Sequence, residues 1–238
     1  MTTRKKAAFS LKKTLILLVI LLVPGTIYYF LSGKVENKYK PLPYLGPKEL
    51  SGTFHLSGEK KIADTIYHKV QPFTLIDGGG EKSSFPIREG TLSVVNFFYT
   101  RCPSFCYRMN REMNEVATFF SKSDRVYLYS ISVDSTDQPA VLRQYGKRFQ
   151  KKNTNWKFLV GDQQKVFQLA NQEFLLNALK DTLQDSIFIH SPYMVLLDAQ
   201  QHIRGYYNAT EREEVSRLIN EIKLLLTEEL RNRKATVI

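Results

Sequence analysis

The sequence predicts a mixed α/β domain carried behind a single N-terminal membrane-spanning helix. Two observations predict this fold class. Apolar runs typical of buried strands alternate with segments of helical spacing, and the alternation ends in a hairpin and a last helix. An uncharged apolar stretch near the N-terminus is long enough to cross a bilayer. The length of 238 residues suits one domain with an anchor rather than two large domains.

The predicted membrane anchor covers residues 14–31, which read TLILLVILLVPGTIYYFL and contain no charged side chain. Residues 1–13 form a basic tail with five Lys or Arg residues and no acid, so the positive-inside rule puts this tail in the cytoplasm and the rest of the chain outside. A cleaved signal peptide has a similar layout and stays open as the alternative, although no A-x-A-like cleavage site follows the apolar run. The short tail is unlike a transit peptide and favours a bacterial inner membrane, with the domain in the periplasm.

Residues 32–64 are rich in Pro, Gly and Lys, and this composition predicts an extracytoplasmic tether. The folded domain is then expected to cover residues 65–238. No internal repeat and no low-complexity tract interrupts it.

Charge and cysteine content exclude two classes of protein. The formal net charge is +11, but the basic residues gather near both ends, and no basic stripe interleaved with aromatic residues lies between them. Nucleic acid is therefore not an expected partner. The chain has only two cysteines, too few for the disulfide framework of a small secreted domain.

The segments of the folded domain alternate between strand-like and helix-like patterns. Residues 92–99 form a continuous apolar run, which is typical of a strand buried on both faces, and residues 125–133 are predicted to form a second buried strand. Pro72 restricts residues 70–76 to an edge strand. This order predicts a thioredoxin-like layout, with parallel inner strands and an antiparallel hairpin at one edge. The other predicted elements are a turn at 77–80, helices at 105–120, 138–149, 163–171 and 211–231, a strand at 156–160, and a hairpin from 193–197 and 203–207.

The two cysteines stand where the buried strand at 92–99 gives way to the helix at 105–120. In open α/β sheets ligands gather at the carboxyl ends of strands, and a helix N-terminus stabilises a thiolate. Cys102 and Cys106 are four residues apart, so both sulfurs are expected on one face of a helical turn. This arrangement suits either a redox pair or two ligands to one soft metal ion.

Four histidines are candidates for a third ligand. His55 falls in the predicted tether and His202 in the hairpin turn, so both are expected to be solvated. His68, before the edge strand, is expected at the surface. His190 directly precedes the strand at 193–197, which the layout puts beside the cysteines. Two thiolates and one imidazole form a trigonal site that suits Cu(I), whereas zinc would need a fourth ligand.

Three blocks of sequence carry a resemblance to a known family. They are FFYTRCPSFCYRM, then SISVDSTDQPAVLRQYGKRF, then FIHSPYMVLLDAQQHIRGYY, in this order and behind an anchor. From about residue 70 to its end the chain resembles the Sco/SenC (PrrC) copper proteins, which have a thioredoxin fold. The resemblance implies that copper, preferably Cu(I) with Cu(II) as a second form, is bound by Cys102, Cys106 and His190.

The resemblance also implies a function and an accessory residue. The family builds the dinuclear copper centre of cytochrome c oxidase, so the implied activity is delivery of copper to the copper-bearing subunit, or reduction of that subunit's cysteines. Other copper chaperones or thiol-disulfide reductants are implied partners. The family's conserved Asp maps to Asp134, which could equally cap the next turn. Tyr107 stands where the family usually has Pro, and Tyr99 and Arg101 adjoin the site without an assigned role.

Three other interpretations stay open. The first is a membrane-anchored thiol-disulfide oxidoreductase without bound metal, since Pro192 stands where thioredoxin-type enzymes have a cis-Pro. The second is a peroxidase with a lone catalytic Cys and with Arg101 or Arg108 nearby. The third is a structural Cys102–Cys106 disulfide in a binding domain. Enzymatic turnover is also left open, because metal transfer is stoichiometric.

Overall fold

The computed structural model describes residues 11–32, 41–58, 60–149, 155–176 and 191–236. The chain divides into two compact units, Met1–Pro41 and Leu42–Ile238. The first contains helix α1, Leu11–Ser32, which is apolar all round. Its stretch Lys12–Phe30 is long and apolar enough to cross a membrane, and none of this stretch is buried within the protein. In position and character α1 matches the predicted anchor.

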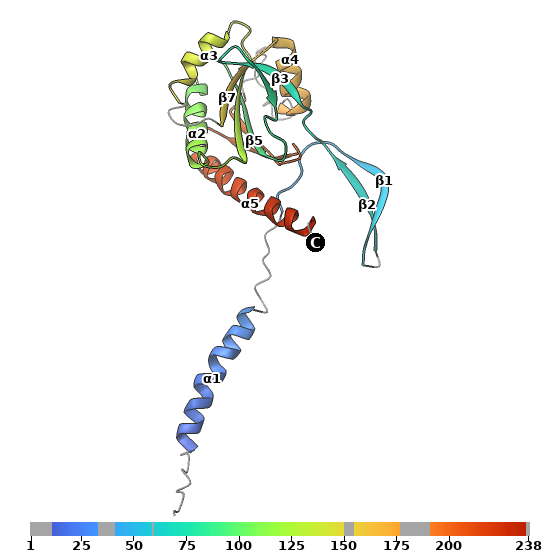
Figure 1. Cartoon of the computed structure of the whole chain (residues 1–238), viewed down its shortest axis with the longest axis vertical. Coiled ribbons are helices and arrows are strands. Elements are labelled where there is room, and N and C mark those ends of the chain that lie inside the picture. Colours follow the sequence, from blue (N-terminus) through green and yellow to red (C-terminus); the bar gives the residue numbers. More distant parts are fainter. Residues whose placement is uncertain (1–10, 33–40, 59, 150–154, 177–190, 237–238) are drawn as a thin grey trace, which may run out of the picture. The chain divides into compact units, whose positions relative to one another are not determined.

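The second unit is built around a seven-stranded mixed sheet with helices on its faces (Figure 1). Its strands are β3 Phe73–Asp77, β4 Lys82–Phe85, β5 Leu92–Phe98, β6 Val126–Ser132, β7 Trp156–Val160, β8 Tyr193–Leu197 and β9 Ile203–Asn208. They lie in the order β4-β3-β7-β6-β5-β8-β9. The inner strands β5, β6 and β7 are parallel, and β8 and β9 form an antiparallel hairpin at one edge. The predicted parallel inner strands and the predicted antiparallel hairpin at one edge are therefore confirmed.

Helices cover both faces of this sheet and bury its central strands. Helices α2 (Cys106–Phe119), α3 (Pro139–Gly146) and α5 (Arg212–Thr236) share one hydrophobic core, and α4 (Gln163–Gln168) with the π-helical turn η1 (Leu169–Glu173) belongs to the other. All seven residues of β5 are buried. Because side chains alternate along a strand, Val94 and Phe98 enter the first core while Val95 and Phe97 enter the second. This double burial explains the continuous apolar run in the sequence.

A chain of hydrogen bonds between buried polar side chains ties α2 to the sheet. Asn96 Nδ2 donates to Asn110 Oδ1 at 3.0 Å, and Asn110 Nδ2 donates to the Tyr145 hydroxyl at 3.1 Å. Trp156 Nε1 donates to Ser130 Oγ at 3.0 Å, which in turn donates to Asn96 Oδ1 at 2.6 Å. Satisfied polar groups in a core fix the relative position of the elements that carry them. The network thus positions the helix that starts at the second cysteine.

The structure differs from the predicted tether over residues 32–64. In the described part of this range, β1 (Lys48–Ser57) and β2 (Lys60–Tyr67) pair antiparallel into a separate two-stranded sheet, the hairpin in Figure 1. The compact unit also begins at Leu42 rather than at residue 65. A bulge in β1 interrupts the alternation that would have signalled a strand, and the Gly and Lys residues around it are typical of a linker.

The predicted edge strand at 70–76 is also corrected. Strand β3 begins at Phe73, directly after Pro72, and it is an inner strand because β4 pairs with it on its outer side. Strand β4 reads KSSF, which is too short and too polar to be recognised from periodicity.

Arg204 holds the segment through which the chain enters the domain. Its Nη2 and Nε donate to the carbonyl oxygens of Leu42 and Pro43 at 2.5 and 3.1 Å, and its Nη1 donates to Asp198 Oδ2 at 3.0 Å. The guanidinium lies 4.1 Å from the centre of the Tyr44 ring. The Arg204 side chain is 3% exposed, so these partners replace the water that its charge has lost.

Candidate metal and redox centre

Cys102 and Cys106 lie at the carboxyl end of β5, in the turn that leads into α2. Cys106 is the first residue of the helix and is buried, whereas Cys102 precedes it and is half-buried. The backbone N–H of Cys102 donates to the carbonyl of Tyr99 at 3.3 Å, which closes the turn. Both cysteines are free thiols. One sulfur therefore faces the surface while the other lies behind it.

The two thiols differ in acidity. Burial acts to raise the pKa of Cys102, but hydrogen bonds from the Cys106 thiol and from Ser104 outweigh it and hold this pKa below the ordinary value. The Ser104 hydroxyl lies 3.5 Å from the Cys102 sulfur. Burial raises the pKa of the Cys106 thiol far above the ordinary value, and the hydrogen bond that it donates to Cys102 raises it further. Cys102 is thus the more acidic thiol of the pair.

Asp137 fixes the strand end just before Cys102. Its Oδ2 accepts from the Thr100 N–H at 3.0 Å and from Ser132 Oγ at 2.6 Å, while its Oδ1 accepts from Thr100 Oγ1. The residue is 3% exposed, so these bonds are shielded from water. Asp137 was not among the predicted site residues, although it follows Asp134 within the same sequence block.

Asp134, the predicted accessory residue, lies at the carboxyl end of β6, the parallel neighbour of β5. Its Oδ1 accepts from the N–H of Thr136 at 2.8 Å, and its Oδ2 pairs with Arg101 Nη2 at 2.8 Å. Burial acts to raise the pKa of Asp134, but the bonds from Arg101 and Thr136 outweigh it and lower this pKa. The carboxylate therefore caps the turn after β6 and also contacts the loop that carries Cys102.

Two tyrosines lie close to the sulfurs. Burial, the charge of Cys102 and a hydrogen bond to its sulfur raise the pKa of Tyr99 to about 12. Burial dominates the rise of the pKa of Tyr145 to about 12, and both cysteines add to it. A phenol with so high a pKa stays a hydrogen-bond donor at neutral pH. Sequence position next to the cysteines is a signal for Tyr99, whereas no local signal points to Tyr145.

The predicted histidine ligand, His190, lies outside the described residues. The other histidines can be compared with their predictions. His55 is in β1, is 58% exposed, and pairs with Asp64. His202 was predicted to be solvated, but its side chain is 21% exposed and Nδ1 lies 3.2 Å from Asp198. His68 is likewise half-buried, with Nε2 2.7 Å from the carbonyl of Glu173.

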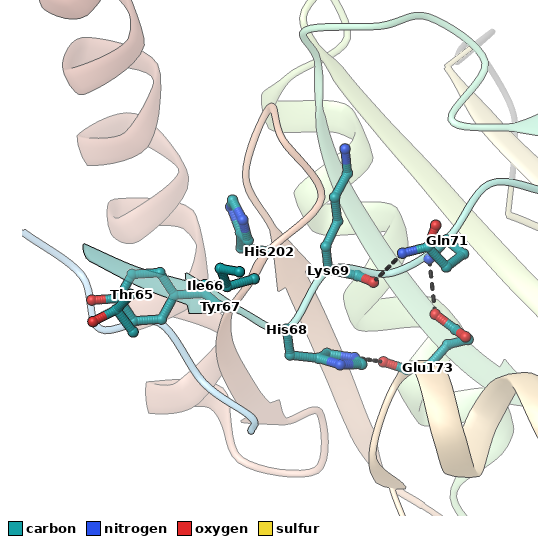
Figure 2. A pocket seen from close by; sticks show the side chains of 8 residues that line it. All are labelled: Thr65, Ile66, Tyr67, His68, Lys69, Gln71, Glu173 and His202. Carbon is teal, nitrogen blue, oxygen red and sulfur yellow. Dashed lines mark hydrogen bonds between the residues drawn. The ribbon is translucent and has the colours of Figure 1, made fainter. Parts of the chain in front are cut away.

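A pocket of about 690 Å³ lies at the opposite end of the sheet from the cysteines. Figure 2 shows His68, His202 and Glu173 among the side chains that line it, at the base of the β1–β2 hairpin. Ser93 of β5 pairs with Leu197 of β8, so the β8–β9 turn with His202 lies beside the beginning of β5 rather than its end. The seven residues of β5 separate the two ends by about 20 Å. The two histidines are therefore not ligands to the cysteine site.

The described part of the cysteine site fits a soft metal ion incompletely. Two sulfurs in contact are soft donors, and such donors select Cu(I) over harder ions. Among the residues that the structure describes, no group of three or more His, Cys, Asp or Glu side chains could hold a metal ion. The described residues therefore supply two of the three predicted ligands.

A model of the SCO1/SenC family matches residues 63–227 of the chain, which include both cysteines and the whole central sheet. This chain belongs to the SCO1/SenC family. The family is linked to cytochrome c oxidase assembly, and the resemblance seen in the three sequence blocks is thereby confirmed.

Individual relatives of this Sco family chain are distant. A SCO1 protein homolog of Bacillus subtilis is 25% identical over 169 residues, which are 70% of this chain and 87% of the relative. A SCO2-like protein of Rickettsia typhi is 26% identical over 212 residues, which are 87% of this chain and 95% of the relative.

Solved structures share the fold at low sequence identity. A SCO1/SenC family lipoprotein of Bacillus anthracis superposes with a TM-score of 0.58 at 20% identity, over 67% of this chain and 95% of the other. BsSco, a Sco family cytochrome c oxidase assembly protein with a disulfide switch, superposes with a TM-score of 0.57 at 24% identity, over 67% of this chain and 94% of BsSco. Copper-bound ScoI of Bradyrhizobium japonicum superposes with a TM-score of 0.51 at 22% identity, over 66% of this chain and 99% of ScoI. The thioredoxin-like Sco fold is thus shown.

Proposed function

We propose that this Sco family protein is a membrane-anchored metallochaperone that binds copper through Cys102, Cys106 and His190. The copper is held preferably as Cu(I), with Cu(II) as a second form. It is passed to the copper-bearing subunit of cytochrome c oxidase for the dinuclear centre. Other copper chaperones or thiol-disulfide reductants load and reduce the protein.

One observation carries this proposal: the contact between the Cys102 and Cys106 sulfurs at the carboxyl end of β5, with Cys102 reachable from the surface. A pair of thiols so placed offers two soft ligands and an entry path. Binding requires the reduced pair, because a disulfide offers no thiolate. A copper-bound structure of a Sco relative agrees with this chemistry.

The proposed location is the bacterial inner membrane, with α1 as a single-pass anchor. The basic tail before α1 would lie in the cytoplasm and the domain in the periplasm. Support comes from the length and apolar character of Lys12–Phe30. An oxidising periplasm would make the redox state of the cysteine pair a control on copper binding.

The test is Cu(I) titration of the full chain in detergent, reduced and kept anaerobic, against a competing chelator. We expect one copper ion per chain. Cys102→Ser or Cys106→Ser should abolish tight binding, and His190→Ala should weaken it on the order of a hundredfold, since even outer partners of metal ligands matter by factors of ten or more. His55→Ala is the matched control and should bind like the wild type. Wild-type affinity in His190→Ala would remove this residue from the site.

A second candidate function, reduction of a partner's disulfide, is favoured by the same sulfur contact and by the disulfide switch described for BsSco. The Cys102 thiolate would attack the partner disulfide, forming a mixed disulfide and releasing one partner thiolate. Cys106 would then attack the Cys102 sulfur and release the second partner thiol. The partner gains two electrons, one proton from the Cys106 thiol and one from water, and the chain keeps a Cys102–Cys106 disulfide until a dithiol reductant restores it. This activity should survive His190→Ala without copper, which separates the two functions.

A further inference from the structure

The β1–β2 hairpin carries an apolar face that nothing in the described structure covers. Leu50, Phe54 and Leu56 are 75%, 54% and 76% exposed. We call these three residues the apolar hairpin face. Figure 1 shows the hairpin extending away from the seven-stranded sheet. Large apolar side chains that are exposed together usually mark a contact surface.

The strand register places the three side chains on one side of the hairpin. Leu50 pairs with Thr65, Phe54 with Ala63, and Leu56 with Lys61 across the two strands. Directly opposite residues point to the same side, and Thr65, Ala63 and Lys61 alternate along β2, so all of them share one face. Leu50 and Phe54 are four residues apart in β1, but Thr65 and Ala63, their partners in β2, are two residues apart. The bulge between Leu50 and Phe54 takes up the extra residues, so both side chains stay on the same face.

The other side of the hairpin combines polar contacts around Asp64 with Ile62 and Ile66, which are 43% and 58% exposed. Asp64 accepts a hydrogen bond from Thr53 Oγ1 at 2.6 Å and pairs with His55 Nδ1. These three groups need no further partner. A two-stranded sheet is marginally stable alone in water and normally packs against something apolar. The apolar hairpin face is the larger of the two uncovered apolar surfaces, with three exposed side chains against two.

The entry of the chain decides which end of the domain is tethered to α1. Arg204 binds the carbonyl oxygens of Leu42 and Pro43 at the end of the sheet opposite to the cysteines. Helix α1 ends at Ser32, so residues 33–41 span at most about 30 Å when fully extended. Strand β1, with ten residues, is itself about 30 Å long. The hairpin can therefore reach the bilayer in which α1 is proposed to lie.

We propose that the apolar hairpin face inserts into the interface of the membrane that anchors the chain. Leu50, Phe54 and Leu56 would lie about 5–10 Å into the boundary between headgroups and acyl chains. Lys61, whose Nζ lies 4.4 Å from the centre of the Phe54 ring, would extend its ammonium group to the headgroups. The inference rests on the proposed membrane anchoring. The short link to α1 keeps the hairpin near the bilayer, and this nearness favours lipid over a protein as the partner of the apolar hairpin face.

The proposal has a consequence for the copper chemistry. If the hairpin end of the sheet faces the bilayer, the cysteine end faces away from it, since the two ends of β5 are about 20 Å apart. Cys102 would then be presented to the periplasmic part of a membrane-bound partner at a fixed height. A hairpin that fixes the orientation of the domain should raise its association rate with such a partner, because the domain then samples fewer unproductive orientations.

The test is tryptophan fluorescence of the full chain in zwitterionic phosphatidylcholine vesicles, with or without bromine on the acyl chains. The native Trp156 is the only tryptophan and is buried, so each single-Trp addition is read as a difference from the wild type. Leu56→Trp probes the apolar face, and Ile62→Trp probes the opposite face at a neighbouring pair. Val141→Trp, exposed on α3, is the distant control.

We expect the emission of Leu56→Trp to shift to the blue and to be mostly lost in brominated vesicles. Ile62→Trp should lose less, and Val141→Trp should not change. Equal emission of Leu56→Trp and Val141→Trp in brominated vesicles would overturn the proposal. A blue shift of Leu56→Trp without bromine quenching would also overturn it, because a second copy or another protein would then be the cover.

Flotation and alkaline carbonate extraction separate this inference from the anchoring on which it rests. A chain that floats with the vesicles, resists extraction and shows no quenching at residue 56 keeps its anchor and loses the hairpin proposal. A chain that is quenched at residue 56 but is extracted by carbonate supports the hairpin and refutes the anchor. A chain that does not float overturns both.

Discussion

The two ends of the central sheet are held by different kinds of interaction. At the cysteine end, short buried side chains such as Asp134 and Asp137 bind the backbone of the neighbouring turns and fix them within a few ångströms. At the other end, the long Arg204 side chain and the stacked rings of Tyr44 and Tyr67 hold a chain segment that enters from outside. Buried carboxylates fix turns at both ends, since Asp198 accepts from the N–H groups of Gln200 and His202 at the second end. The comparison teaches that only this second end adds a long guanidinium and aromatic rings, which hold the entering segment through hydrogen bonds and cation–π contacts.

The apolar residues of the two ends differ as much as the polar ones. Phe98, just before the cysteine loop, is 1% exposed and lies 5.2 Å from Tyr145 and 5.6 Å from Phe158 between ring centres. Phe54 on the hairpin is 54% exposed, with Lys61 as its ring partner. The same residue type therefore stabilises the fold at one end and is available for contact at the other.

The largest expected difference between the two ends is in the stability lost when each phenylalanine is truncated to alanine. Phe98→Ala should lower the free energy of unfolding by about 3–5 kcal/mol, because a cavity opens in the core. Phe54→Ala should change it by about 0.5 kcal/mol or less in detergent, because the ring is already half exposed. Urea unfolding of the full chain followed by circular dichroism measures both. Equal losses would mean that the hairpin is part of the cooperative core.

An intermediate effect is expected in the reactivity of the two thiols. Cys102 has a lowered pKa and is half-buried, whereas Cys106 is buried with a raised pKa. At neutral pH iodoacetamide should therefore modify Cys102 on the order of a hundredfold faster than Cys106, since the thiolate is the reacting form. Mass spectrometry of peptides after timed alkylation of the reduced chain gives both rates, and unfolding in urea should make them similar. Faster modification of Cys106 would reverse the assignment of the nucleophile.

The smallest effect concerns Asp134 and depends on pH. Its folded pKa lies below its unfolded value of about 3.8, so its contribution to stability is fully present above pH 4 and is lost as the pH falls through the folded pKa. Asp134→Asn should cost about 1–2 kcal/mol at pH 7, because hydrogen bonds to a charged acceptor are lost, and the difference from the wild type should shrink below pH 4. Thermal unfolding across this range measures it.

Asp124→Asn is the matched control for that experiment. Asp124 is an exposed carboxylate, 77% accessible, with a long contact to Arg88. Its substitution should leave stability nearly unchanged at every pH, as for most exposed ion pairs. A pH-independent loss in Asp134→Asn would show that the shape of the turn, rather than the charge, is what the residue supplies.

Much of the central fold was predictable from local patterns. Strands β5 and β6 are buried on both faces, so their sequences are mainly apolar without a polar face, and the predicted and observed bounds differ by one residue at an end. The hairpin of β8 and β9 was predicted for the same reason. Strand β4 and the β1–β2 hairpin were missed, because KSSF carries no period and a bulge breaks the pattern of β1.

The candidate site was predictable only in part. Cys102, Cys106 and Asp134 were identified from motifs, and the structure brings the two cysteines into contact and places Asp134 at the end of the neighbouring strand. His190 lies outside the described residues and stays a prediction. Asp137 and Tyr145 were missed, because neither belongs to a local motif of the cysteines.

By itself the sequence determined what is encoded by neighbours along the chain: an apolar span, buried strands, helix periods and a pair of soft ligands four residues apart. Only the tertiary structure decided which distant groups surround those ligands and which apolar residues remain uncovered. The physical reason is that periodicity reports burial on a local face, whereas the acidity of Cys102 and the exposure of Leu56 depend on atoms contributed by other strands and helices.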